Sequence, residues 1–348
     1  YVNGEKHLLN GFGNRNSYPA LGAAVPPELQ WKDVKLIADC NGSALRVGHF
    51  PAAVATVSAC DAYGVLVIQD SGDDEWALHG EPALTYKKEY DRDMMIQYRN
   101  NPSVAVWESN NGIASVKHAT NYYSPRSTEE LAEKWDSLAT RIIESRATSD
   151  YWPTARKIMI GYTAHFKKVA SSPSINLECY YRGNARFDYQ YEKVSADFFS
   201  KQYISNVKDS ACGWIYWMLV ETMESPFMPY LNGKINQKSL GSGAMDGNRF
   251  PKLNYSIFQK ALWAPFPNKP GVALQSSWNL SGIQNVDAWS NCPTVELFLN
   301  GVSKGVRKPD AEARCTWAGI AWESGTLKVA GLDASGKPVC SDERRTAG

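Results

Sequence analysis

Residues 104–115 read VAVWESNNGIAS, an apolar run that opens into a polar loop. Val104 to Trp107 have the length and composition of a short buried strand. Glu108 follows directly, and two asparagines and a glycine come next. A carboxylate and two amides at the carboxyl end of a buried strand are typical of the functional edge of an α/β barrel. This stretch therefore predicts a barrel whose site lies where the strand opens into its loop.

Outward from this stretch, short apolar runs alternate with amphipathic helical patterns from about residue 7 to residue 262. The runs predict strands at 8–13, 43–50, 65–70, 103–109, 156–162, 174–181 and 212–219. The helical patterns predict helices at 25–40, 51–64, 91–101, 127–146 and 187–199. The clearest helix starts at a capping box, Ser127 and Glu130, and its apolar stripe ends at Ile142. Strand–helix alternation over about 250 residues favours an α/β fold closed as a (β/α)8, or TIM, barrel.

A second pattern begins after the segment APFPNKPG (264–271), whose three prolines and one glycine predict a linker. Beyond it the runs TVELFLNG, TWAGIAW and TLKVAGLD alternate every second residue, with turn signals between them. We therefore expect a barrel over 1–263 and a small all-β, Ig-like sandwich over 272–348.

Composition argues against several classes of function. The chain has 348 residues with 37 basic and 36 acidic side chains, a net charge of +1, so nucleic acid is not an expected partner. No run of about 18 apolar residues occurs, so no membrane insertion is expected. The seven cysteines form no C-x-x-C pair, the five histidines lack metal-binding spacing, and no phosphate-cradling glycine loop is present, so we expect neither metal nor cofactor. Twelve tryptophans and 18 tyrosines suit either large cores or a carbohydrate site.

Candidate site residues follow the predicted strands, whose carboxyl ends meet at one edge of such a barrel. They include Asn14, Arg15, Asp70, Glu221 and Glu224, and eight to which we assign roles: Arg46, His49, Asp73, Glu108, Asn111, Glu178, Tyr180 and Trp217. Glycoside hydrolysis needs one acid to protonate the leaving oxygen and one carboxylate to attack or stabilise the oxocarbenium-like centre. Glu108 and Glu178, surrounded by amides and aromatic rings, suit that reaction, and the remaining six are assigned to substrate binding.

These motifs resemble glycoside hydrolase family 2, the group of β-galactosidases, β-glucuronidases and β-mannosidases. Residues 11–51 are similar to the family's opening barrel segment, which closes on an Arg…(Ser/Gly)-His-(Tyr/Phe)-Pro motif. VLVIQDSGDDEW, NNPSVAVWESNNG and CGWIYWML resemble its third, fourth and eighth strands, and 268–348 resemble its appended Ig-like domain. The resemblance implies a jelly-roll domain and an Ig-like domain before the barrel. Both are missing here, so we expect the chain to be a fragment of a longer protein.

The resemblance also implies individual roles. Arg46 and His49 match the second-strand motif and would position substrate, although an Arg46 satisfied inside the barrel is the alternative. Asn111 matches the residue that would bond the sugar 2-hydroxyl. Glu178 matches the nucleophile, with a structural pair to Arg182 as the alternative. Trp217 matches the ring that lines the sugar site, or it packs in the core.

One position departs from the family pattern. The general acid/base should follow Asn111 directly, but Gly112 stands there and cannot carry a proton. Glu108 lies four residues earlier, on the order of 13 Å lower on a straight strand, and serves only if a bulge or altered loop lifts it. We take Glu108 as first candidate for the acid. The others are Asp73, Asp74, Glu75, Glu221 and Glu224.

The resemblance therefore implies an exo-acting, retaining glycoside hydrolase that removes a terminal, β-galactoside-like sugar from an oligo- or polysaccharide. The alternative is a carbohydrate-binding barrel that has lost catalysis, because of Gly112. An unrelated barrel enzyme with a binding module is a third reading. A secreted or periplasmic location is expected, and assembly into a homo-oligomer, which is frequent in the family, is left open.

Overall fold

The computed structural model describes residues 2, 4–70, 72, 81–108, 125–136, 142–145, 157–162, 174–179, 189–208, 212–221, 243–279 and 281–346. The chain divides into two compact units. The first comprises Tyr1–Ala38, Gly42–Tyr180 and Asn206–Glu224, and the second comprises Asp39–Asn41, Tyr181–Ser205 and Ser225–Gly348. A barrel forms in the first unit, and a β-sandwich forms in the second.

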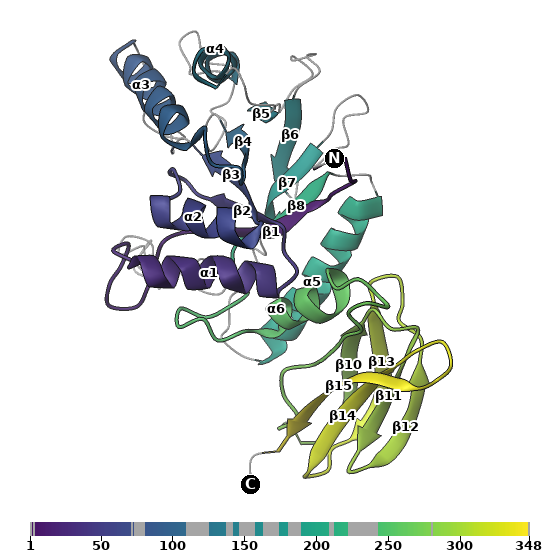
Figure 1. Cartoon of the computed structure of the whole chain (residues 1–348). Coiled ribbons are helices and arrows are strands. Elements are labelled where there is room, and N and C mark those ends of the chain that lie inside the picture. The colour runs from purple at the N-terminus through teal and green to yellow at the C-terminus, as the bar shows by residue number, and fades with distance from the viewer. Residues whose placement is uncertain are drawn as a thin grey trace. The chain divides into compact units, whose positions relative to one another are not determined.

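Eight parallel strands close into a barrel in the order β1 to β8 (Figure 1). They are β1 (Leu9–Asn14), β2 (Ala44–Val47), β3 (Leu66–Asp70), β4 (Val104–Glu108), β5 (Ile142–Ser145), β6 (Lys157–Tyr162), β7 (Ser174–Cys179) and β8 (Gly213–Tyr216). The first five strands are connected through α1 (Pro27–Asp39), α2 (Val54–Tyr63), α3 (Glu81–Tyr98) and α4 (Pro125–Trp135). Helices α1 and α2 lie outside the strands in Figure 1. The predicted (β/α)8 barrel is confirmed.

The interior of the barrel is apolar at its centre and polar at the carboxyl ends of the strands. Leu9, Ala44, Ile68, Val106, Ile175 and Ile215, one from each of six strands, form its buried core. Because alternate residues of a strand share a face, the positions two further along continue the same inward row. On β2, β3 and β4 these positions are Arg46, Asp70 and Glu108, each fully buried. The strand pattern thus delivers three charged side chains to one level of the barrel.

Strand β7 contains a β-bulge just before its end. Gly161 of β6 pairs with Asn176, but the next residue, Tyr162, pairs with Glu178, so β7 has one extra residue there. The pairing with β8 shows the same single insertion. One extra residue moves every later position to the opposite face of a strand. Counting through the bulge from the core residue Ile175 therefore brings position 178 into the inward alternation.

The helix predicted over 127–146 is wrong in its second half. Helix α4 begins at Pro125, two residues before the predicted capping box, and ends at Trp135. Ile142–Ser145 form strand β5, which pairs in parallel with β4 and β6. Ile142 continued the helical period only by coincidence, and two consecutive β-branched isoleucines favour a strand. This segment supplies the eighth strand that the apolar runs had not identified.

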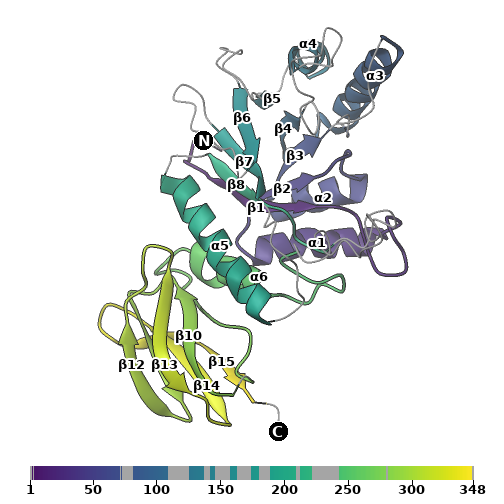
Figure 2. The same ribbon diagram turned by 180° about the vertical axis from the view of Figure 1, so that it is seen from behind.

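The second unit contains a sandwich of two antiparallel sheets (Figure 2). One sheet has the order β13-β10-β9 and the other β12-β11-β14-β15. The strands are β9 (Val272–Leu274), β10 (Ile283–Ser290), β11 (Thr294–Leu299), β12 (Val302–Arg307), β13 (Arg314–Ala321), β14 (Thr326–Leu332) and β15 (Pro338–Arg345). Alternate residues of β11 and β14 pack with Trp278 and Trp317 in its core. The predicted all-β sandwich after the barrel is confirmed.

Helical segments of the second unit pack on this sandwich. They are α5 (Tyr189–Lys208), α6 (Leu253–Ile257) and a short π-helix, η3 (Phe258–Leu262). Ala196, Leu253 and Ile257 share a buried cluster with Trp289 of β10. Among the described residues, no helix is both long and apolar enough to cross a membrane.

Residues 264–271, predicted as a linker, are hydrogen-bonded to the β10–β11 turn. The side-chain nitrogen of Asn291 donates to the carbonyl oxygens of Ala264 and Lys269, each at 2.9 Å. Its side-chain oxygen accepts a bond of 2.8 Å from the Gly271 N–H. One asparagine therefore holds both ends of this proline-rich segment. The boundaries 1–263, 264–271 and 272–348 stay a prediction.

Candidate active site

Arg46 of β2 is the centre of a buried ion-pair cluster at the carboxyl end of the barrel. Its Nε donates to Glu108 Oε2 at 2.6 Å and its Nη2 to Glu108 Oε1 at 2.5 Å. The same Nη2 also donates to Asp70 Oδ2 at 3.1 Å. All three side chains have no exposed surface. A bidentate guanidinium–carboxylate pair in such a site is rigid, because moving either partner would leave the other as an uncompensated buried charge.

Strand register explains why these three residues meet. Arg46 pairs with Ile68 of β3, and Asp70 lies two residues beyond Ile68 on the same face. Strand β4 carries one extra residue near its start, so Asp70 pairs with Glu108 and not with Trp107. The two carboxylates therefore sit side by side within reach of one guanidinium.

Trp107 fixes the end of β4 from outside the barrel. It is fully buried, and its Nε1 donates to Asp136 Oδ2 at 2.8 Å, directly after α4. Because neighbouring residues of a strand face opposite sides, this bond anchors the outward face while Glu108 points inward. The last two residues of β4 thus have different roles: Trp107 packs on the outside of the barrel, and Glu108 points into the site.

Trp217 lies across the same end of the barrel, just after β8. Its ring stacks on His49, with centroids 5.1 Å apart and planes inclined by 10°. The guanidinium carbons of Arg15 and Arg46 each lie 5.6 Å from its centroid. Cations above an indole face are attracted by its quadrupole. The indole therefore holds His49 and two arginines together in one wall.

Two glycines make room for this indole. A Cβ built on Gly13 would lie 2.2 Å from Trp217 Cε3, and one on Gly48 would lie 2.8 Å from Trp217 Cη2. The segment after β8 is also tied to β1, since the Leu219 N–H donates to the Gly13 carbonyl at 2.8 Å. Any side chain at position 13 must therefore displace the ring.

His49 lies beside this cluster. Its Nδ1 is 3.5 Å from Asp70 Oδ2 and 3.4 Å from Arg46 Nη2, so the imidazole contacts both partners of the Arg46–Asp70 ion pair. Within the described residues, no three His, Cys, Asp or Glu side chains gather as metal ligands would.

The structure brings together four of the eight predicted site residues: Arg46, His49, Glu108 and Trp217. Glu178 belongs to β7, and its backbone lies at the carboxyl end of that strand, but its side chain lies outside the described part of the chain. Asp73, Asn111 and Tyr180 also lie outside the described residues, as does Gly112. The roles given to all eight stay predictions.

Three further residues, which the sequence analysis gave no role, also shape the site. Asp70 shares Arg46 with Glu108, and Gly13 and Gly48 seat the indole. The alternation from Ile68 to Asp70 signals an inward-facing carboxylate at the end of β3. Nothing in the sequence signals that the two glycines touch a tryptophan some 170 to 200 residues later, because this contact depends on barrel closure.

The sequence of this chain is similar to those of known proteins. Residues 1–130 match the glycosyl hydrolases family 2 TIM barrel domain. A β-glucuronidase of Formosa agariphila is 26% identical over 95% of the chain, and the β-galactosidase BoGH2A of Bacteroides ovatus is 24% identical over all of it. These first 130 residues belong to the TIM barrel domain of glycoside hydrolase family 2.

Solved structures show that the fold is shared along the whole chain. A β-glucuronidase from glycoside hydrolase family 2 superposes over 100% of this chain and 38% of its own, with a TM-score of 0.82 and 24% identity. The β-glucuronidase of Parabacteroides merdae gives a TM-score of 0.74 at 18% identity, over 100% of this chain and 50% of its own. This chain spans 35% and 49% of the lengths of the two curated relatives named above. Residues 282–340 match a domain of unknown function, DUF4982.

Proposed function

We propose that this chain carries the catalytic barrel of a retaining, exo-acting β-glycosidase, with Glu178 as the nucleophile. The observation that carries the proposal is the bulge in β7, which brings position 178 into the inward alternation of the barrel. Strand pairing of Cys179 with Tyr216, the last residue of β8, sets this position close to the level of Trp217, which follows β8 directly. A carboxylate at that height would face the wall built by Arg46, His49 and Trp217.

In the first step, the Glu178 carboxylate attacks the anomeric carbon while an acid protonates the departing glycosidic oxygen. A covalent glycosyl-enzyme forms, and the aglycone leaves with the transferred proton. In the second step, the same acid acts as a base on water, which displaces Glu178 and releases the sugar. This chemistry requires the two carboxyl groups about 5–5.5 Å apart.

The geometry around Glu108 favours a positioning role over the acid role. Both of its oxygens accept bonds from Arg46, and the side chain has no exposed surface. An acid must present its proton to the leaving oxygen, and neither oxygen of Glu108 is directed to an open site. We therefore propose that Glu108 holds Arg46 in place and that a carboxyl on a neighbouring loop supplies the proton. Glu221, half-buried after β8, is one such group among the described residues.

Leaving groups separate these two roles. The acid matters little for an aryl glycoside whose phenol leaves without protonation, and it matters greatly for an alkyl glycoside. Loss of the acid should therefore spare kcat/KM for dinitrophenyl glycosides, because this ratio reports the first step alone. Loss of a positioning residue should lower kcat/KM for both kinds of substrate alike. We expect Glu108→Gln to slow both. Selective loss on the alkyl glycoside alone would restore Glu108 as the acid.

For the sugar, we propose a terminal β-glucuronide, with the β-galactoside expected from the motifs as the second candidate. The family 2 relatives named above include both specificities. Arg15 supports an acidic sugar, because its guanidinium lies above the indole at the mouth and is only partly buried. Action on such polysaccharides agrees with the proposed secreted or periplasmic location.

The decisive assay uses dinitrophenyl β-glucuronide and β-galactoside with three proteins: wild type, Glu178→Gln and Glu133→Gln. Glu133 is an exposed glutamate of α4 and provides a matched control. We expect turnover by wild type and Glu133→Gln, loss of at least about 10⁴-fold in Glu178→Gln, and a covalent adduct on Glu178 with a 2-fluoro sugar. Turnover by Glu178→Gln at the wild-type rate would remove the nucleophile assignment. Sugar binding without turnover by wild type would instead support the alternative function, a carbohydrate-binding barrel without catalysis, which Gly112 suggests.

A further inference from the structure

The β12-β11-β14-β15 sheet of the sandwich has an outer face with a hollow in it. Leu327 and Val329 of β14 point into the sandwich core and have no exposed surface. Thr326, Lys328 and Ala330 alternate with them and therefore face outward. Ala330 is nevertheless only 5% exposed. A methyl group so deeply covered on an outward face forms the floor of a depression, which we call the outer-face pocket.

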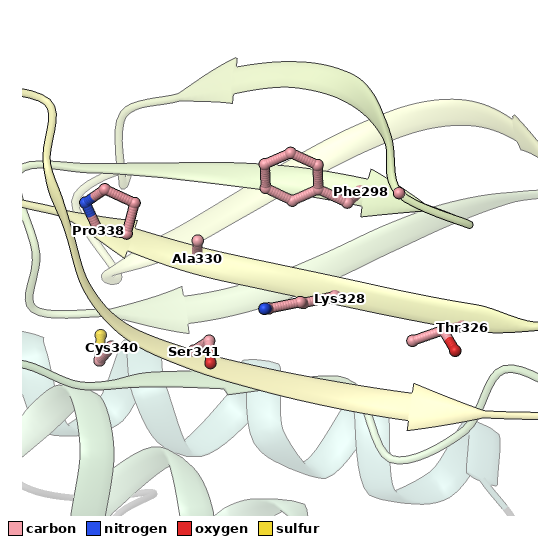
Figure 3. Close-up of a pocket in the computed structure, with 8 residues that line it drawn as sticks. Phe298, Thr326, Lys328, Ala330, Pro338, Cys340 and Ser341 are labelled. Carbon is pink, nitrogen blue, oxygen red and sulfur yellow. The ribbon is translucent and has the colours of Figure 1, made fainter.

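The outer-face pocket has a volume of about 470 Å³, within the range of about 300–1,000 Å³ typical of small-molecule sites. It is lined by Phe298, Gly301, Thr326, Lys328, Ala330, Pro338, Cys340 and Ser341 (Figure 3). Phe298 pairs with Lys328 across β11 and β14, and Ser341 pairs with Ala330 across β14 and β15. The site thus stands on paired strands, which hold side chains more firmly than loops do.

Its chemistry combines one flat ring, one ammonium and two hydroxyl groups. The Phe298 ring offers an apolar face of the kind that packs on a sugar ring. Thr326 and Ser341 can donate and accept hydrogen bonds, as sugar hydroxyl groups require. Such a site, apolar in its lining with a few placed polar groups, is typical of one that binds a polar ring compound.

The positive charge of Lys328 indicates that the ligand is acidic. It is the charged residue of the lining, and its ammonium group makes no hydrogen bond or ion pair with any residue in the described part of the chain. Its cross-strand neighbour Glu343 pairs with Arg345 at 3.0 Å, and Glu296 accepts a bond from Ser303. The nearby carboxylates thus have other partners. A ligand carboxylate would supply a negatively charged partner for the Lys328 ammonium.

We propose that the outer-face pocket is an accessory binding site for a uronic-acid residue of an oligo- or polysaccharide. The sugar ring lies on Phe298, its carboxylate meets the Lys328 ammonium, and its hydroxyl groups bond Thr326 and Ser341. The site contributes no group to catalysis. It keeps an acidic polysaccharide on the protein while the barrel cleaves terminal residues, and in this respect it rests on the proposed function.

The test measures binding of α-1,4-linked tetragalacturonate by calorimetry, because an α-linked chain is not a substrate for the proposed β-specific barrel. Maltotetraose serves as the neutral probe of the same linkage. Lys328→Gln and Phe298→Ala remove the two main contacts, and Lys308→Gln removes an exposed lysine outside the pocket as the matched control. Hydrolysis of dinitrophenyl glycosides by each variant reports the barrel separately.

We expect wild type and Lys308→Gln to bind tetragalacturonate equally and maltotetraose at least tenfold more weakly. Lys328→Gln should weaken tetragalacturonate about tenfold and leave maltotetraose unchanged, and Phe298→Ala should weaken both. Hydrolysis of the aryl glycosides should be unaffected in all three variants. Equal affinity of wild type and Lys328→Gln, or equal binding of the two oligosaccharides, would overturn the proposal even if the barrel is active. An inactive barrel with intact tetragalacturonate binding would instead refute only the proposed function.

Discussion

Replacing Glu108 by glutamine tests whether the buried cluster stabilises the barrel. The substitution keeps the size of the side chain and removes its charge. Two charge-assisted bonds, at 2.5 and 2.6 Å, join Glu108 to Arg46 with no solvent contact. Breaking a buried pair by neutralising one partner costs about 3–5 kcal/mol. Because Asp70 still accepts a bond from Arg46 at 3.1 Å, we expect the lower end, about 3 kcal/mol.

The assay is thermal and urea unfolding of wild type and Glu108→Gln, followed by tryptophan fluorescence. A loss of about 3 kcal/mol corresponds to a fall of about 6–12 °C in the midpoint of a unit of roughly 200 residues. The transition of the second unit should stay in place, because the cluster lies wholly within the first.

The matched control is Glu343→Gln, which removes a carboxylate from an exposed pair. Glu343 lies 3.0 Å from Arg345, and their side chains are 44% and 74% exposed. Solvent screens such a pair, so the loss should be below about 1 kcal/mol. A cost for Glu108→Gln as small as that for Glu343→Gln would refute the view that the buried cluster holds the barrel end together.

Three further predictions concern single side chains. Gly13→Ala places a Cβ 2.2 Å from the Trp217 ring, so kcat/KM on aryl glycosides should fall about 100-fold with an unchanged circular dichroism spectrum; full activity would contradict the steric argument. Asn291→Ala removes three hydrogen bonds to 264–271 and should destabilise the second unit by about 2–3 kcal/mol, with faster amide exchange at Gly271; unchanged exchange would count against this. Burial lowers the pKa of Lys252 from 10.5 to about 8, despite the charge of Glu192. The unfolded chain then binds more protons between these pH values, so stability relative to Lys252→Met should rise as pH increases from 8 to 10.5; a constant difference in unfolding midpoint would exclude it.

Most of the barrel could be predicted because its strands are buried on both faces. Runs such as VLVIQD and CGWIYW are continuous and apolar, and each became a strand. Strand β5 was hidden because Ile142 falls on the helical period of the preceding stripe, and a single sequence does not show where that helix stops. Helix α4 ends at Trp135, with no glycine or proline to mark the place.

The site was predictable only as far as strand ends are predictable. Arg46, His49 and Trp217 were expected at one edge, and they meet there. The partnership of Glu108 with Arg46 depends on one extra residue in β4, which brings Glu108 level with Asp70. Bulges depend on the pairing of neighbouring strands, so local patterns in the sequence do not reveal them.

The extra residue in β7 has a consequence for comparing relatives. A homologue that lacks it would carry a glutamate aligned with position 178 on the outer wall of its barrel, among the surrounding helices. An alignment that closes this one-residue gap would then equate a carboxylate on the outside of the barrel with the nucleophile proposed here. Relatives should therefore be classified as active or inactive by the length of strand β7 as well as by the residue type aligned with position 178.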